Sequence, residues 1–199
     1  MRPRRHLAIF LKAPRLGQVK SRLAAGIGWV EATRFHRAQA QRLIRLLGRD
    51  RRWRTTLWLA PRGALGQRDL PGLNLRRFDQ GLGDLGQRMA RPFRRLPSGD
   101  VVLVGSDIPG LTAMIVAQAF RLLLSHDAVF GPAFDGGYWL VGFKSARRRR
   151  HRFGVVRWST RHALSDTLAG LKCARVALLP KLTDIDTPAD YRRWRSRSR

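Results

Sequence analysis

Strand-like and helix-like segments alternate along this chain, and the alternation restricts its fold more than any other feature. Because parallel neighbours in a sheet need a crossover connection, repeated strand–helix units build a mainly parallel sheet covered by helices on both faces. The strand-like apolar runs cover residues 6–12, 53–60, 73–78, 100–106, 126–131, 138–143 and 174–179, and the segments with helical spacing cover 31–48, 113–124, 159–170 and the stretches that begin at 84 and 188. The sequence therefore predicts an α/β protein with a three-layer α/β/α architecture.

Two neighbouring runs break this alternation. Residues 126–131 and 138–143 are separated by a short loop with no helical segment between them. Such a spacing is typical of antiparallel neighbours, so we expect a mixed sheet with one antiparallel excursion. The length of 199 residues suits a single domain over residues 1–195, followed by a flexible basic tail at 196–199.

The chain is strongly basic. It holds 40 Lys and Arg against 13 Asp and Glu, a formal net charge of +27, which favours anionic or phosphorylated partners. The arginines are spread along the chain, including the run 147–150 and the tail, so both a solvated basic surface and peripheral contact with nucleic acid or an anionic membrane stay open. Cys173 lies in an apolar stretch and is predicted to be a buried, inert thiol. With neither a signal-peptide pattern nor a membrane-spanning stretch, we expect a cytoplasmic protein.

An acidic residue follows the most apolar run of the chain. Residues 101–104 read as a strand buried on both faces, and Ser106 and Asp107 come directly after Gly105. Ligands of open α/β sheets collect at the carboxyl ends of the strands, so Asp107 is either a ligand to something or the cap of a loop.

The segment KAPRLGQVKSRL, residues 12–23, follows the first strand-like run. Gly17 makes backbone N–H groups accessible, and Lys12, Lys20 and Arg22 supply cations, which is what the phosphates of a nucleotide need. The segment lacks the Walker pattern of glycines and lysine, and a solvated basic loop is the alternative.

The segment QGLGDLGQRM, residues 80–89, contains three glycines in the G-x-G-x-x-G pattern of dinucleotide-binding sites. The pattern follows the third strand-like run instead of the first, and Asp84 with Gln87 also forms the signature of a helix start. Three interpretations remain: a dinucleotide site, helix initiation alone, and a loop that holds a base or ribose through Gln80 and Gly83.

The segment GPAFDGGYWLVG, residues 131–142, joins the two closely spaced strands. Gly136 and Gly137 allow the backbone to approach a ligand next to Asp135, and Tyr138 could flank that ligand. A plain Asp-Gly turn is the alternative interpretation.

The segment LTDIDTPADY, residues 182–191, contains a helix start explained by Thr187, Pro188 and Asp190. That start leaves Asp184 and Asp186 without a local role. If they lie near Asp107, they form an oxygen site for Mg²⁺ or Mn²⁺, which adds substrate phosphates and waters to a few carboxylates. The histidines have no metal-ligand spacing and no serine lies in a nucleophile elbow, so a hydrolase triad is disfavoured.

Taken together and in this order, these five segments resemble a bacterial family known as radical-SAM/selenodomain-associated glycosyltransferases, which is similar to the molybdenum-cofactor and phospholactate guanylyltransferases. The resemblance covers nearly the whole chain. It implies a nucleotide-diphospho-sugar transferase (GT-A type) fold, with a nucleotide across the first strands and a divalent metal at the end of the fourth. The Gly-Gly-rich first loop of the molybdenum-cofactor enzymes is absent, and Ser106 stands where many metal-dependent glycosyltransferases have a second acid.

By this resemblance, Asp107 looks like the catalytic metal-binding acid and Asp186 its second ligand. Lys20 and Arg22 look like phosphate ligands, and Asp135 with Gly136 looks like a contact to donor or acceptor. The expected function is a glycosyltransferase that uses a nucleotide-sugar donor, a divalent metal and an acceptor that the sequence does not identify. The alternatives are a nucleotidyltransferase that uses a nucleoside triphosphate and releases pyrophosphate, and a non-catalytic domain that binds nucleic acid or membrane through its cationic surface.

Overall fold

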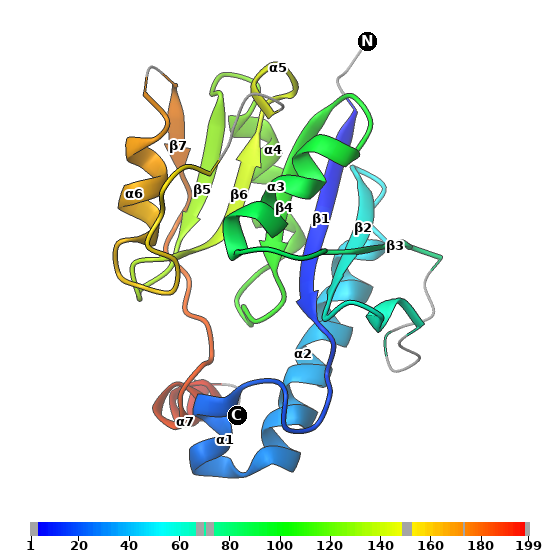
Figure 1. Ribbon diagram of the computed structural model, residues 1–199, viewed down its shortest axis with the longest axis vertical. Coiled ribbons are helices and arrows are strands. Elements are labelled where there is room, and N and C mark those ends of the chain that lie inside the picture. The colour runs from blue at the N-terminus through cyan, green and yellow to red at the C-terminus, as the bar shows by residue number, and fades with distance from the viewer. Residues whose placement is uncertain (1–3, 67–69, 71–73, 149–152, 173, 198–199) are drawn as a thin grey trace.

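The sheet is the centre of the molecule (Figure 1). A computed structural model describes residues 4–66, 70, 74–148, 153–172 and 174–197. In this part of the chain the strands are β1 (Arg5–Lys12), β2 (Arg54–Ala60), β3 (Arg76–Asp79), β4 (Asp100–Gly105), β5 (Ala128–Pro132), β6 (Tyr138–Phe143) and β7 (Val176–Leu178). They form one seven-stranded sheet in the order β3-β2-β1-β4-β6-β5-β7.

One strand runs against the others. β6 pairs antiparallel with both β4 and β5, whereas the pairs β1–β2, β1–β4, β2–β3 and β5–β7 are parallel. The predicted mixed sheet with one antiparallel excursion is therefore confirmed, and the excursion is β6.

Helices cover both faces of the sheet. Their bounds are α1 (Ser21–Ile27), α2 (Trp29–Gly48), α3 (Leu85–Arg95), α4 (Ala113–Leu122), α5 (Ser145–Arg148), α6 (Ala163–Ala169) and α7 (Pro188–Arg197), with a 3₁₀ turn η1 (Ala64–Gly66). Apolar side chains of α2 and α4 pack on one face, and those of α3 and α6 pack on the other. This arrangement confirms the predicted three-layer α/β/α architecture.

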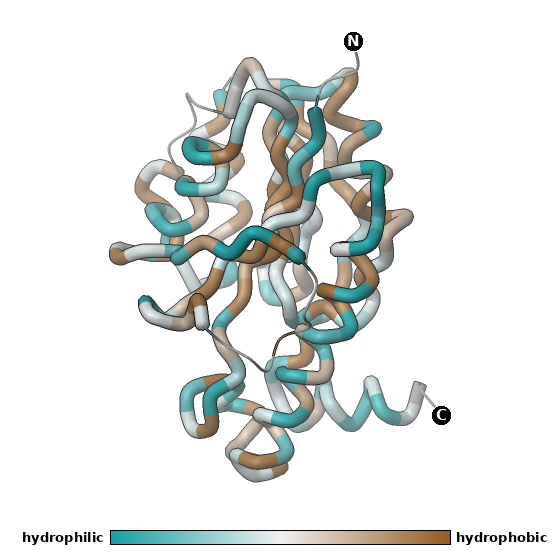
Figure 2. Tube along the Cα trace, turned by 90° about the vertical axis from the view of Figure 1, so that its right-hand side faces the viewer, coloured by the Kyte–Doolittle hydropathy of each residue, from teal (hydrophilic) through white to brown (hydrophobic). Residues whose placement is uncertain are grey.

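The core is divided between these two faces because side chains alternate along each strand. In β1, Leu7, Ile9 and Leu11 belong to the cluster under α2 and α4, whereas Ala8 belongs to the cluster under α3. Figure 2 shows the apolar segments concentrated along the strands in the interior. In the part of the chain that the structure describes, no helix is both long and apolar enough to cross a membrane.

A third apolar cluster lies beyond the carboxyl end of the sheet. It joins α1, the first turns of α2, and α7 through Leu23, Phe35, Ile185 and Tyr191. The rings of Phe35 and Tyr191 meet edge to face with centroids 5.2 Å apart. This cluster brings the segment after β1 next to the segment before α7, although they are more than half the chain apart.

The structure differs from the sequence-based prediction in several segments. Residues 21–27 form α1, a short helix that the sequence analysis did not predict. α6 begins at residue 163 and not at 159, since residues 157–162 form turns held by the Arg157–Asp166 ion pair of 2.8 Å.

The structure describes only part of the predicted basic segments and does not describe Cys173. Arg147 and Arg148 lie in α5, while Arg149, Arg150 and Cys173 lie outside the described residues. Of the predicted tail, Ser196 and Arg197 belong to α7, and residues 198–199 lie outside the described part.

Candidate functional site

The candidate site lies where the connectivity of the sheet changes direction. From β1 the chain moves to β2 and β3 on one side, whereas β4 lies on the other side of β1. Such a switch point leaves a crevice at the carboxyl ends of the two central strands. Lys12 ends β1, and Ser106 and Asp107 directly follow β4, so three of the predicted residues come to this crevice.

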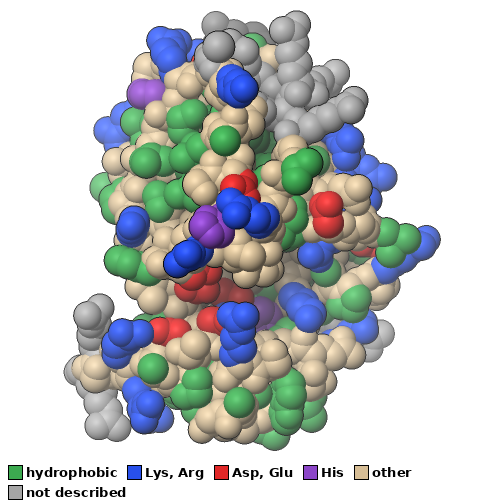
Figure 3. All heavy atoms as spheres, turned by 60° about the vertical axis from the view of Figure 1, so that its left-hand side comes forward, with side chains coloured by type: hydrophobic (Ala, Val, Ile, Leu, Met, Phe, Trp, Pro, Cys, Tyr) green, Lys and Arg blue, Asp and Glu red, His purple; other side chains and the backbone are tan. Residues whose placement is uncertain are grey.

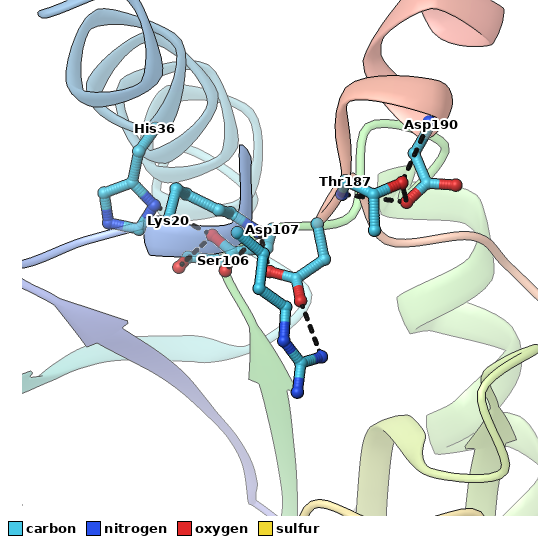
Figure 4. A network of polar contacts seen from close by, with 8 residues as sticks. Lys20, His36, Ser106, Asp107, Thr187 and Asp190 are labelled. Atoms are coloured by element: carbon cyan, nitrogen blue, oxygen red, sulfur yellow. Dashed lines mark hydrogen bonds and ion pairs between the residues drawn. The ribbon is translucent and has the colours of Figure 1, made fainter. Parts of the chain in front are cut away.

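Asp107 is the centre of a polar network (Figure 4). Its Oδ2 lies 3.0 Å from Lys20 Nζ, its Oδ1 lies 3.0 Å from His36 Nδ1, and Ser106 Oγ donates to Oδ1 over 3.2 Å. Burial opposes ionisation of this carboxyl, but the charge of Lys20 and the hydrogen bond from His36 outweigh it and hold the pKa of Asp107 well below its usual range. Asp107 is therefore an anion that stays charged at neutral pH.

Lys20 connects the two predicted metal ligands. Its ammonium lies 3.0 Å from Asp107 Oδ2 and 3.6 Å from Asp186 Oδ1, and its side chain is only 5% exposed. The backbone of Lys20 has φ 54° and ψ 44°, a left-handed conformation that is costly for a residue with a Cβ. Arg22, which is exposed, reaches Asp186 Oδ2 from the other side over 3.2 Å. The structure therefore brings the two acids to one cation, which is the ammonium of Lys20.

His36 is a site residue that the sequence-based reasoning missed. It projects from α2, is 2% exposed, and its Nε2 lies 2.8 Å from the backbone oxygen of Lys12 while Nδ1 faces Asp107. Each ring nitrogen of His36 therefore lies against an oxygen atom, the backbone oxygen of Lys12 on one side and the Asp107 carboxylate on the other. No motif surrounds His36 in the sequence. The available signal was a polar residue on the buried face of an otherwise amphipathic helix.

Two adjacent cavities open beside this network. The larger, of about 480 Å³, is lined by Lys12, Gln80, Arg88, Ser106 and Asp107 among others. The smaller, of about 240 Å³, is lined by Asp135, Gly137 and Trp158 among others. Leu85, Ile108, Tyr138, Trp139 and Asp184 line both cavities. The larger cavity has the cations of Lys12 and Arg88 beside the Asp107 network, whereas the smaller cavity lies next to the β5–β6 turn.

Gln80 positions the wall of the larger cavity. Its amide nitrogen donates to the backbone oxygens of Leu11 and Trp58 over 3.2 and 3.0 Å, and its side-chain oxygen accepts from Arg88 over 3.2 Å. These bonds join the ends of β1 and β2 to α3. Gln80 lines the larger cavity, and its polar groups are already engaged in holding the strands.

The glycine-rich segment before α3 has a structural explanation. Asp84 and Gln87 form a complete capping box, in which Asp84 Oδ1 accepts from the N–H of Gln87 over 2.7 Å and Gln87 Oε1 accepts from the N–H of Asp84 over 3.2 Å. Gly83 has φ +103°, and a Cβ there would collide with the Gln87 side chain. The geometry thus accounts for this motif as the start of a helix.

The β5–β6 turn places three predicted residues at the smaller cavity. Asp135 Oδ1 accepts from the N–H of Gly137 over 2.9 Å, and Tyr138 approaches Thr167 with 3.4 Å between their hydroxyl oxygens. Burial raises the pKa of the Tyr138 phenol. Gly136 has φ +86°, and its missing Cβ leaves room for the backbone of Arg161. A glycine is therefore required at position 136 for the segment before α6 to pack against this turn. The turn therefore has its own packing role and also lines a cavity.

Of the predicted phosphate-loop residues, Gly17, Lys20 and Arg22 line neither cavity. Gly17 is exposed, has φ +73°, and a Cβ there would meet open space. Its positive φ turns the chain between β1 and Lys20. Gly17 thus acts by shaping the loop that carries Lys20.

Asp184, which the sequence analysis considered with Asp186 as a candidate metal ligand, lines both cavities. Burial raises its pKa, and the negative charge of Asp135 raises it further. Thr187 and Asp190, by contrast, form the expected helix start, since Thr187 N–H and hydroxyl both donate to Asp190 Oδ2, over 2.9 and 2.7 Å.

Carboxylates gather in this part of an otherwise basic molecule. Figure 3 shows acidic side chains in the hollow between the body of the sheet and the part formed by α1 and α7. Within the described residues, no group of three or more His, Cys, Asp or Glu side chains is arranged to hold a metal ion. A divalent ion here would therefore take at most two carboxylates and complete its shell with phosphate oxygens and water, as Mg²⁺ commonly does.

Comparisons with known proteins show which family and which enzymes this chain is similar to. The profile of the family described as "uncharacterized protein conserved in bacteria (DUF2064)" matches residues 43–160. The chain is 33% identical over 103 residues to 3-phospho-D-glycerate guanylyltransferase of Phenylobacterium zucineum (strain HLK1), a match covering 51% of this chain and 47% of that protein. It therefore spans about half the length of this relative. It is 29% identical over 174 residues to 2-phospho-L-lactate guanylyltransferase of Methanopyrus kandleri, covering 87% of this chain and 83% of that protein.

Solved structures show the same fold. A protein of Desulfovibrio desulfuricans G20, provisionally named a nucleotide-diphospho-sugar transferase, superposes with a TM-score of 0.80 at 31% identity, covering 92% of this chain and 82% of that one. Rv0371c of Mycobacterium tuberculosis H37Rv, solved in complex with manganese, superposes with a TM-score of 0.56 at 16% identity, covering 97% and 98%. The predicted nucleotide-diphospho-sugar transferase fold is thereby confirmed. None of these four proteins bears the radical-SAM/selenodomain name, which stays a prediction.

Proposed function

This chain belongs to the DUF2064 family of uncharacterized proteins conserved in bacteria, and we propose that it is a nucleotide-dependent transferase that moves a nucleotidyl group from a nucleoside triphosphate to an acceptor oxygen. The observation that carries the proposal is the convergence of Asp107 and Asp186 on one cation beside a cavity lined by Lys12, at the switch point of the sheet. A triphosphate needs such a combination of cations and metal-binding oxygens.

The choice of donor differs from the expectation based on the sequence. The sequence favoured a nucleotide sugar and kept the nucleoside triphosphate as the alternative. Both curated relatives are named guanylyltransferases, which supports the triphosphate donor for this chain. The D. desulfuricans protein is named for sugar transfer, so glycosyl transfer from a nucleotide sugar remains the second candidate.

A divalent Mg²⁺ or Mn²⁺ ion fits the residues present. The ammonium of Lys20 is a cation already held by Asp107 and Asp186, so these two carboxylates are placed to share one positive charge. Asp107 and Asp186 would hold the ion, which when bound would neutralise phosphate charge and help the leaving group depart.

The residues of this chain have distinct roles in the proposed reaction. The acceptor oxygen forms a bond to the α-phosphorus, the bond from that phosphorus to the oxygen bridging to the β-phosphate breaks, and pyrophosphate leaves. Lys12, Lys20 and Arg22 balance the charge that develops on the departing phosphates. Asp135 contacts the acceptor and takes the proton of its hydroxyl group.

The Gln80 amide and the Ser106 hydroxyl keep the proposed nucleotide-binding cavity in shape. Gln80 bonds the ends of β1 and β2, and Ser106 donates to Asp107, so both keep the cavity wall and the carboxylate in place. Gly83 supports the same wall by allowing the tight start of α3. Gly137 and Tyr138 line the second cavity and are proposed to contact the acceptor, while Gly136 lets that turn form.

The test is a thermal-shift screen with each nucleoside triphosphate and a set of nucleotide sugars, with and without Mn²⁺ or Mg²⁺. We expect a metal-dependent rise in melting temperature with one triphosphate, because ligands that bind the folded state stabilise it. Asp107→Asn should abolish this rise, whereas the matched control Asp50→Asn should keep it, since Asp50 pairs with Arg52 at the other end of the sheet.

The alternatives predict different results in the same screen. A rise with nucleotide sugars alone would favour glycosyl transfer. A folded protein that responds to no nucleotide would refute both transfer reactions and favour a non-catalytic binding domain.

A further inference from the structure

The smaller cavity has an unusual charge for a protein of this composition. Its described walls include the carboxylates of Asp135 and Asp184, and no lysine, arginine or histidine of the described residues lines it. The rest of the wall is mainly apolar and aromatic, with Tyr138, Trp139 and Trp158 contributing rings. In a chain with 40 basic residues, an acidic cavity without a basic wall residue is a deviation that needs a physical reason.

The two carboxylates lack the partners that other acids have. Asp50, Asp166 and Asp190 each pair with an arginine, at 2.6, 2.8 and 2.7 Å. Among the described residues, neither Asp135 nor Asp184 lies within ion-pair distance of a lysine, arginine or histidine, and the side chain of Asp135 accepts a hydrogen bond from the Gly137 N–H. No direct ion pair within the described residues therefore neutralises these two carboxylates, although the charge of Lys20 acts on Asp184 from beyond ion-pair distance.

A buried donor at the same cavity is also without a partner. Trp139 is 4% exposed and lines both cavities, and its Nε1 has no hydrogen-bond acceptor among the described residues. Buried N–H groups are nearly always bonded, so an unpaired one beside a cavity indicates a ligand oxygen that completes it. A hydroxyl group supplies such an oxygen.

Electrostatics decide which charge this cavity accepts. A phosphate or carboxylate would lie next to two like charges in partly desolvated surroundings, where repulsion is strong. An ammonium group gains from both carboxylates, and the faces of tryptophan and tyrosine rings attract cations further. The volume of about 240 Å³ suits a small molecule.

We propose that the smaller cavity binds the acceptor of the transfer reaction, and that this acceptor is a small amino alcohol: a cation that also bears a hydroxyl group. This inference rests on the proposed function, because the shared walls of the two cavities bring the hydroxyl next to the nucleotide. The ammonium group faces Asp184 and the aromatic rings, and Asp135 keeps the role of taking the hydroxyl proton. The acceptor thus differs in charge from the phosphorylated acids named in the two curated relatives.

Tryptophan fluorescence tests binding directly, since Trp139 and Trp158 line the cavity. The probes are choline and ethanolamine as amino alcohols, glycerol as an uncharged alcohol, and 3-phospho-D-glycerate as an anionic acid. We expect both amino alcohols to change the emission in the absence of nucleotide and to bind about tenfold or more tightly than 3-phospho-D-glycerate, as the charge of the wall predicts. Asp184→Asn should weaken choline binding about tenfold, since it removes one of the two charges. The control Asp50→Asn should leave binding unchanged.

Pyrophosphate release then links binding to the reaction. With the triphosphate identified by the thermal-shift screen, choline or ethanolamine should raise the rate of pyrophosphate release over that with glycerol or 3-phospho-D-glycerate. Stronger binding or faster release with 3-phospho-D-glycerate would overturn the proposed acceptor, as would failure of both amino alcohols to bind. Because binding is measured without nucleotide, failure of the protein to bind any triphosphate would refute the proposed function separately.

Discussion

At the scale of single residues, Lys20 determines what Asp107 and Asp186 can bind. Its ammonium contacts both carboxylates, is almost fully buried, and is carried by a residue with a left-handed backbone. A divalent ion placed between the same carboxylates would be repelled by this ammonium at short range. Lys20 is also the proposed ligand of the triphosphate, so an incoming anion gives the ammonium another partner.

Substitution of Lys20 tests whether its ammonium competes with a divalent ion for the carboxylates of Asp107 and Asp186. In Lys20→Met the carboxylates lose their internal cation, so Mn²⁺ should bind about tenfold or more tightly in the absence of nucleotide. The same variant should bind the triphosphate more weakly. Electron paramagnetic resonance of free Mn²⁺ measures the first effect, and thermal shift measures the second.

Lys12→Met is the matched control for the first effect. Lys12 lines the larger cavity and ends β1 with an exposed side chain, and no ion pair joins it to Asp107 or Asp186. We expect Mn²⁺ affinity close to that of the wild type. If Lys20→Met and the wild type bind Mn²⁺ with equal affinity, the ammonium of Lys20 does not compete with the ion.

At the scale of elements, the start of α7 holds Asp186 near Lys20. The N–H and hydroxyl of Thr187 donate to Asp190 Oδ2, and Arg193 pairs with Asp190 Oδ1 at 2.7 Å. Burial opposes ionisation of Asp190, but the bonds from Thr187 and the pairing with Arg193 lower its pKa below the usual value. The ionised carboxylate therefore stabilises both the helix start and the segment that carries Asp186.

The ionisation of Asp190 gives this arrangement a pH dependence, which Asp190→Asn removes. A group with a lowered folded-state pKa contributes stability above its unfolded pKa of about 3.9 and loses that contribution as the pH falls further. The variant should be less stable than wild type by about 1 kcal/mol at pH 7. The difference should shrink below about pH 4.

Urea denaturation between pH 7 and 3 measures this difference, with Asp50→Asn as a second acid that lies away from α7. A free-energy difference between Asp190→Asn and wild type that stays constant over the whole range would show that the charge of Asp190 has no part in holding α7.

At the scale of the whole molecule, four of the 13 acidic residues gather in one part of a strongly basic chain. The net charge is +27, yet Asp107, Asp135, Asp184 and Asp186 lie at the cavities or at the network beside them. The basic residues, by contrast, occur along the whole chain. A polyanion is therefore attracted to the outer surface, and a small ligand enters a cleft of different charge.

Duplex DNA should bind this outer surface without sequence preference. Because each neutralised phosphate releases counterions, the affinity should fall about 1,000-fold between about 50 and 200 mM salt if about six phosphates are contacted. Asp107→Asn should bind DNA as the wild type does, and a triphosphate should not compete. Fluorescence anisotropy of a labelled duplex measures both effects, and competition by the triphosphate would instead locate DNA in the cleft.

Much of the fold and several site residues could be predicted from local patterns. The buried run before Gly105 and the close spacing of β5 and β6 set the strand directions, and the Thr187–Asp190 and Asp84–Gln87 signatures located two helix starts. These features depend on periodicity and capping within about ten residues, which sequence records directly. The position of Asp107 at the end of a central strand followed from the same reasoning.

The tertiary structure alone decided how these parts meet. α1 and α7 pack together beyond the sheet, which brings Lys20 between Asp107 and Asp186 from three distant segments. His36 joins them from the buried face of α2, and the aromatic residues of β6 and the loop before α6 divide the cleft into two cavities. A sequence specifies which strands and helices form through local hydrogen bonding and apolar spacing, whereas the neighbours of each charged side chain depend on how the crossover connections fold those elements onto one another.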